Sequence, residues 1–179
     1  CSQIETIDAE IHISGTFTIV DCPKFKSLTS PFYSFGSLII RNCPVFEILP
    51  NTLTTAQNLI LCSNPKLSIL PLEVKVNNAL VIENCPKIKM LPDDLEVSHT
   101  LFLQNLPDLT HLPQGLHNLS MVSLSQCPEV EHLPQDISAE WNVSFLECHK
   151  LSEIPKGLTK VRNNFILYAC QNLRSLPEK

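Results

Sequence analysis

One pattern of hydrophobic residues and prolines returns every 21 residues along this chain of 179 residues, and it leaves few folds open. Self-similarity at such a period predicts a solenoid, in which each copy forms one coil and packs only against its neighbours. The pattern reads L-x-L-x-x-C-P-x-L-x-x-L-P-x-x-L, and its copies begin at Phe17, Leu38, Leu59, Leu80, Leu101, Val122, Val143 and, after one inserted residue, Phe165. We number the positions of the repeat from the first residue of this pattern.

The prolines fit the same repeat. Six of the 14 stand at position 7 and seven at position 13, and only Pro31 lies outside these two columns. Proline lacks a backbone donor and interrupts helices, so long helices are excluded from the coil. Alternation at positions 1 to 5 predicts a short strand, and stacked copies predict a parallel β-sheet. We expect extended or 3₁₀ backbone on the return path of each coil.

The repeat also describes the two ends of the chain. Counting backwards places Cys1, Ile4, Ile7 and Ile11 at positions 6, 9, 12 and 16 of an earlier copy. We therefore expect one domain over residues 1–179, with about eight coils, a partial first coil at 1–16 and a partial last coil at 165–179. Because Cys1 and Lys179 both fall within a coil, we expect the chain to be a piece of a longer protein.

The pattern resembles the strand-and-turn segment of leucine-rich-repeat proteins, and the resemblance covers essentially the whole chain. A cysteine or asparagine at position 6 is a trait of that family, and Leu106 is the one departure. The resemblance implies a right-handed solenoid of the β/α type, with a curved parallel sheet on the concave face and mostly extended or 3₁₀ convex segments. Position 6 holds Cys22, Cys43, Asn64, Cys85, Leu106, Cys127, Cys148 and Cys170.

The short period and segments such as Leu91-Pro92-Asp93-Asp94-Leu95 resemble the leucine-rich-repeat effectors of pathogenic bacteria. That resemblance implies a secreted protein that acts in the reducing host cytoplasm and binds a host protein. The cysteine followed by L-x-x-L-P also resembles repeats of plant intracellular immune receptors, which usually run a few residues longer. A third interpretation is the substrate arm of a ubiquitin ligase, since some bacterial repeat effectors carry such a domain after the repeats. The spacing favours the bacterial effector.

The cysteines follow the repeat rather than a metal-binding spacing. Seven of the eight stand at position 6, where we predict a buried structural column of thiols that donate weakly to backbone carbonyls. The chain has no C-x-x-C pair of the kind that binds zinc. Cys62 stands at position 4, so we expect it to face solvent on the sheet and to be the reactive thiol.

Charge and motifs exclude several classes of function. A net charge of -5 gives no basic footprint for nucleic acid, and no run approaches the roughly 18 apolar residues of a membrane span. There is no phosphate-binding loop and no G-x-S-x-G motif. Cys148 and His149 are adjacent, but Cys148 belongs to the predicted buried column. We expect no enzyme activity, no cofactor, no membrane insertion and a monomeric protein.

Position 11 carries the one weak metal candidate. His111, His132 and Glu153 occupy this position in three successive coils and would have to converge to bind an ion. We favour the alternative that they form a solvated polar column, so no metal is predicted.

The side chains at the exposed strand positions 2, 4 and 5 are predicted to form the concave surface. We predict that this surface binds another protein, which is a host protein in the favoured interpretation. An apolar strip edged by polar groups is typical of a protein interface, although such residues also simply suit strands. A second patch is predicted at Leu146, Ile166 and Tyr168, with Trp141 as an anchor at the rim. The strip comprises Ile39, Ile60, Val81 and Phe102, edged by Arg41, Cys62, Glu83 and Gln104 at position 4 and by Asn42, Ser63, Asn84 and Asn105 at position 5.

Overall fold

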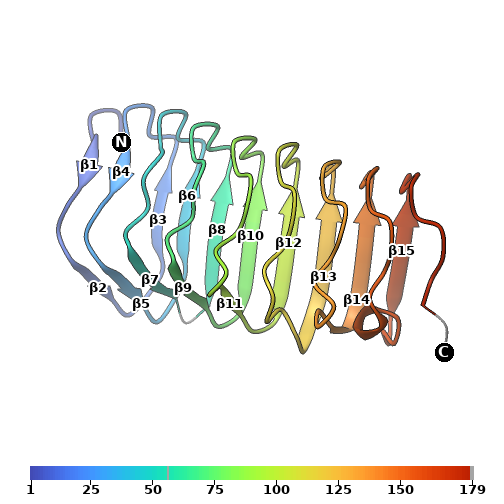
Figure 1. The fold of residues 1–179 in the computed structure, drawn as a ribbon. Coiled ribbons are helices and arrows are strands. Elements are labelled where there is room, and N and C mark those ends of the chain that lie inside the picture. The colour runs from blue at the N-terminus through green and yellow to red at the C-terminus, as the bar shows by residue number, and fades with distance from the viewer. Residues whose placement is uncertain (56, 178–179) are drawn as a thin grey trace.

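The chain folds into a parallel β-solenoid of about eight turns. A computed structural model describes residues 1–55 and 57–177. Figure 1 shows the coils stacked side by side from the N-terminal to the C-terminal end. Glu178 and Lys179, which the repeat places in the partial last coil, lie outside the described residues, as does Ala56.

A long parallel sheet of eight strands runs along one face of the solenoid. Its register advances by 21 residues from strand to strand, so that Leu38 pairs with Leu59 and Leu80 with Leu101, and by 22 residues at the last pair, where Val143 pairs with Phe165. Residues at one repeat position therefore lie side by side across the sheet. The strands are β3 (Phe17–Val20), β6 (Leu38–Arg41), β8 (Asn58–Cys62), β10 (Ala79–Glu83), β12 (Thr100–Gln104), β13 (Leu119–Ser125), β14 (Ala139–Leu146) and β15 (Asn164–Tyr168).

A shorter parallel sheet lies on the return path of the N-terminal coils. Here the sequence alternates apolar and polar residues, as in Glu73-Val74-Lys75-Val76, and buries every second side chain. Two further short strands, β1 (Thr6–Ile7) and β4 (Ser27–Leu28), pair with each other. The shorter sheet comprises β2 (Ile11–Ile13), β5 (Phe32–Ser34), β7 (Thr52–Thr55), β9 (Glu73–Val76) and β11 (Glu96–Val97).

The C-terminal coils replace this second sheet by tight turns. In segments of the type L-P-x-x-L, the amide of the last residue donates to the proline carbonyl three residues earlier, as from Ile137 to Pro134 (3.2 Å) and from Leu158 to Pro155 (3.0 Å). Asp and Gly between these residues suit turns, whereas the earlier coils have β-formers there. The one helix in the described part of the chain is the 3₁₀ helix η1 (Lys156–Leu158).

The expectation of extended or 3₁₀ backbone on the return path is therefore confirmed. The expected β/α character is not found, since the solenoid has almost no helix. Pairing of the extended segments into a second sheet was not predicted. In the N-terminal half, both faces of the solenoid are β-sheets, in which neighbouring strands lie about 4.8 Å apart. A stack bends strongly only when the elements on its convex face are wider than those on its concave face, so equal spacing on both faces disfavours strong curvature there. We therefore call the predicted concave surface the long sheet.

The hydrophobic core runs as one continuous column between the two faces. From β6 to β14, residues at positions 1 and 3 of the long sheet, such as Leu59 and Leu61, are fully buried. At the two ends of the sheet, Phe17 and Phe165 are only partly buried. Equivalent side chains stack from coil to coil, and the rings of Phe25 and Phe46 lie parallel with centroids 5.3 Å apart. Within the described residues, none of the helices is long and apolar enough to cross a membrane.

Candidate functional site

The predicted apolar strip forms on the long sheet. Ile39, Ile60, Val81 and Phe102 are paired in register on β6, β8, β10 and β12, and each is half-buried. Three strand spacings make the strip about 14 Å wide. It ends at β13, where Ser123 takes the same position and is itself buried. The strip is thus a bounded patch, and we keep the name apolar strip for these four residues.

The polar edge at position 4 differs from the prediction at one residue. Arg41 is exposed and Glu83 and Gln104 are half-buried, but Cys62 is only 9% exposed. It pairs with Arg41 on one side and Glu83 on the other, and these longer side chains screen it. Burial raises the pKa of its thiol; Arg41 lowers this pKa, and the carboxylate of Glu83 raises it. The expectation that Cys62 is exposed to solvent is therefore wrong, while its reactivity stays a prediction that burial and the raised pKa disfavour.

Position 5 ends each strand rather than extending its exposed face. Every residue at this position has a positive φ, between 51° and 56°, so this residue turns the chain into the position-6 column. Asn and Asp tolerate this left-handed conformation best. Their side chains also join coils, with Asn42 donating to Asp21 (2.9 Å) and Asn105 to Asn84 (2.7 Å). The assignment of position 5 to the exposed strand face is thus corrected.

The three residues of the predicted C-terminal patch lie on two adjacent strands, and Trp141 lies apart from them. Leu146 on β14 pairs with Tyr168 on β15, and Ile166 lies two residues before Tyr168 with its side chain exposed. Trp141 is also exposed, but it lies five residues before Leu146, roughly 16 Å along the strand. The structure therefore groups Leu146, Ile166 and Tyr168 and leaves Trp141 at the other end of β14.

Position 6 forms a buried column in which asparagine and several cysteine side chains join adjacent coils. The thiol of Cys85 donates to the carbonyl of Leu61 in the preceding coil (3.6 Å), while the backbone N–H of Asn64 faces its sulfur. Asn64 makes both contacts with stronger groups: Nδ2 donates to the Ile40 carbonyl (2.9 Å), and Oδ1 accepts from the Cys43 N–H (3.2 Å). At this position an amide and a thiol therefore contact equivalent backbone groups of the preceding coil.

The predicted burial of this column is confirmed in the complete coils. Cys1 is exposed and Cys170 half-buried, because they belong to the partial coils at the two ends, whereas the column cysteines between them are buried. All eight cysteines are free. Burial raises the pKa of Cys85 and Cys127 to about 11 and that of Cys148 to about 12, so these thiols stay protonated at neutral pH.

The weak metal candidate does not assemble. His111 and His132 lie on adjacent coils, but their side chains contact Thr110 (2.9 Å) and Ser152 (3.1 Å) respectively. Glu153 accepts a hydrogen bond from Gln135 instead (2.9 Å). Among the residues that the structure describes, no group of three His, Cys, Asp or Glu side chains has the arrangement of a metal site.

The structure adds an exposed apolar column that the sequence interpretation missed. Ile48, Ile69 and Met90 occupy position 11 in three successive coils, and Ile69 is 73% exposed. Leu72 is exposed on the same return path. The repeat contains the signal, since these residues precede His111 and His132 in one column. This outer column competes with the apolar strip as a binding surface.

No protein-family model and no curated protein matches the sequence.

Proposed function

We propose that this chain is a protein-interaction module of the leucine-rich-repeat type, which binds another protein through the apolar strip on the long sheet. The observation that carries the proposal is the alignment of Ile39, Ile60, Val81 and Phe102 on four adjacent strands. Their side chains are half-buried in the free protein, so a partner that covers them removes further apolar surface from water.

The surroundings of the strip support a protein partner. Arg41, Glu83 and Gln104 form a polar edge on the neighbouring position, which matches the apolar centre and polar rim of protein interfaces. A sheet held by strands on both sides presents these groups on a rigid backbone, so little conformational entropy is lost on binding. Phe102 is the largest side chain of the strip, and aromatic residues dominate the energetics of such surfaces.

The test replaces Phe102 by Asp and compares the variant with Ile69→Asp. Ile69 is more exposed than Phe102 and belongs to the outer apolar column, so it serves as a matched control. We expect Phe102→Asp to weaken partner binding by about 30-fold, the equivalent of about 2 kcal/mol, and Ile69→Asp to leave it unchanged. Partners captured from a host lysate by the wild type are identified and titrated against both variants.

Circular dichroism and thermal melting establish that both variants keep the fold. If Ile69→Asp abolishes binding while Phe102→Asp binds like the wild type, the outer column is the site and the proposal fails. If binding survives both substitutions, neither apolar surface carries it.

We further propose that the module is the target-binding domain of a secreted bacterial effector that acts in the host cytoplasm. The support is the short repeat with its L-P-x-x-L segments, together with a position-6 column of free thiols suited to a reducing compartment. The sequence of the complete gene tests it. A nucleotide-binding domain upstream would favour an immune receptor instead, and a downstream catalytic cysteine domain would favour a ubiquitin ligase.

A further inference from the structure

A hollow lies on the outer face of the shorter sheet, away from the apolar strip. Its volume is about 620 Å³, which falls in the range of small-molecule sites. Three rings surround it: His12 and Tyr33, stacked with centroids 5.0 Å apart, and Phe35. The remaining lining comes from Ile13, Ser14, Ser34, Thr54 and Asn77.

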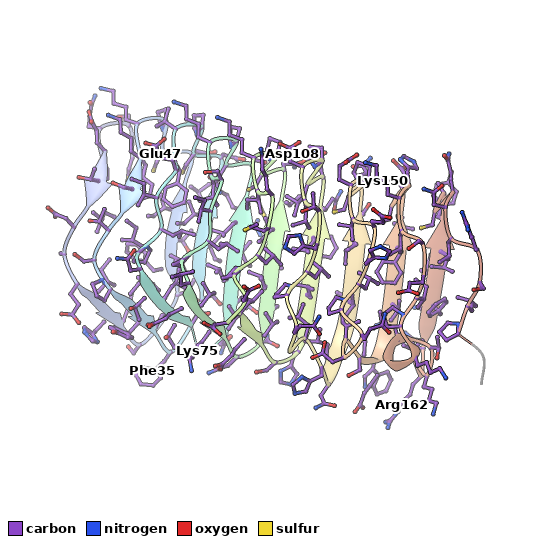
Figure 2. The ribbon with its side chains drawn as sticks, in the orientation of Figure 1. Phe35, Glu47, Lys75, Asp108, Lys150 and Arg162 are labelled. Carbon is purple, nitrogen blue, oxygen red and sulfur yellow. The ribbon has the colours of Figure 1, made fainter. Side chains whose placement is uncertain are left out.

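Phe35 is the most exposed aromatic side chain near this hollow, with 79% of its surface accessible. Figure 2 shows it projecting from the ribbon. Its backbone is nevertheless held firmly, because its N–H donates to the Ile13 carbonyl (3.1 Å). The Ser34 hydroxyl donates to the Gly15 carbonyl (2.7 Å) and accepts from the Gly36 N–H (3.0 Å). The ring is thus presented to solvent by a fixed loop.

Four of the polar side chains around these rings are not used by the fold. Among the described residues, no hydrogen bond engages the side chains of Ser14, Tyr33, Thr54 or Asn77. They offer hydroxyl and amide groups that both donate and accept. No carboxylate, lysine or arginine lines the hollow. The carboxylate of Glu10 contacts the lining residue His12 (2.8 Å), and Lys75 is paired with Glu96 (2.9 Å).

We propose that this hollow binds a neutral hexopyranose oligosaccharide. One face of a pyranose ring consists of C–H groups, which suit the exposed ring of Phe35 beside the stacked His12 and Tyr33, while its hydroxyl rim suits the uncommitted polar groups. A planar aromatic ligand would stack equally well but would leave those polar groups without partners. An anionic ligand would find no lysine or arginine in the lining, and a cationic ligand would have to compete with His12 for the carboxylate of Glu10. The site is separate from the surface of the proposed protein-binding function and does not depend on it.

The test is an NMR titration of the chain with cellohexaose, maltohexaose and mannohexaose, each to about 20 mM so that millimolar affinities are detected. We expect at least one sugar to shift the amide resonances of residues 12–14, 33–35, 54 and 77. Phe35→Ala should raise the Kd at least tenfold, and Thr54→Val several-fold. Leu72→Ala is the matched control, because Leu72 is 77% exposed on the next-but-one coil and should leave the Kd unchanged.

Because Phe35 is so exposed, its substitution should leave the melting temperature unchanged, which separates loss of binding from loss of fold. Phe102→Asp should bind the sugar like the wild type, whatever it does to a protein partner. The proposal is overturned if none of the three sugars shifts these resonances, if the shifts persist in Phe35→Ala, or if indole binds more tightly than every sugar.

Discussion

Replacing Asn64 by Leu tests the hydrogen-bonding role of the position-6 column. Asn64 is fully buried, and its amide satisfies the Ile40 carbonyl and the Cys43 N–H at once. Leu has a similar volume and occurs at this position as Leu106, so the substitution removes the polar contacts without opening a large cavity. The perturbation therefore isolates hydrogen bonding from packing.

The expected loss follows from these contacts. Leaving a buried donor or acceptor without a partner costs about 1–3 kcal/mol, so two such groups cost about 4 kcal/mol. Burial of the leucine side chain offsets about 2 kcal/mol. We expect Asn64→Leu to lower the free energy of unfolding by about 2 kcal/mol. Asn64→Cys should lose less, about 1 kcal/mol, because a thiol there can contact the same two groups, as Cys85 does in the next coil.

Urea denaturation at pH 7 under reducing conditions, followed by far-UV circular dichroism, measures both variants. Equal m-values for the variants and the wild type would confirm that the same structure unfolds in each. The order wild type, Asn64→Cys, Asn64→Leu is the informative result. If Asn64→Leu is as stable as Asn64→Cys, the two hydrogen bonds contribute nothing net and the column is held by packing alone.

Three further predictions concern other parts of the repeat. Ser63→Asn should raise the free energy of unfolding by about 1 kcal/mol, since Asn tolerates φ of 55° better than Ser and can connect Asn42 to Asn84. Ser63→Ala cannot make this connection and should show no gain in stability in urea melts. Gly36→Ala should lower the free energy of unfolding by about 2 kcal/mol, because the added Cβ would lie 2.5 Å from the Gly15 backbone. In the control Gly15→Ala, the added Cβ meets no atom within 4 Å, so the urea midpoint should change little. Equal losses in the two variants would contradict the close approach of these coils. Because burial raises the pKa of Cys85, Cys127 and Cys148, their protonated thiols stabilise the fold fully below pH 9.0, and this contribution should fall by about 1.4 kcal/mol per thiol per pH unit as pH rises towards about 11. Urea midpoints at pH 8, 9 and 10 measure the loss, and a slope as steep in the triple Ala variant as in the wild type would refute the assignment.

Much of the fold follows from the 21-residue period. It predicts the stacked coils, the parallel pairing of Leu38 with Leu59, the burial of the position-6 cysteines and the alignment of the apolar strip. These features are periodic, because each coil repeats the same local environment and contacts only its neighbours. A pattern of side chains is sufficient to define them.

The features that the sequence did not reveal depend on contacts between coils. Cys62 is screened because Arg41 and Glu83 flank it on adjacent strands, a cause that its own repeat position does not contain. The second sheet likewise needs alternating segments from several coils to meet in register, and the hollow at Tyr33 and Phe35 needs side chains from four coils. The sequence by itself determined which residues repeat. Only the tertiary structure decided which of them stay exposed, because exposure depends on the size and direction of the neighbours that stacking brings together.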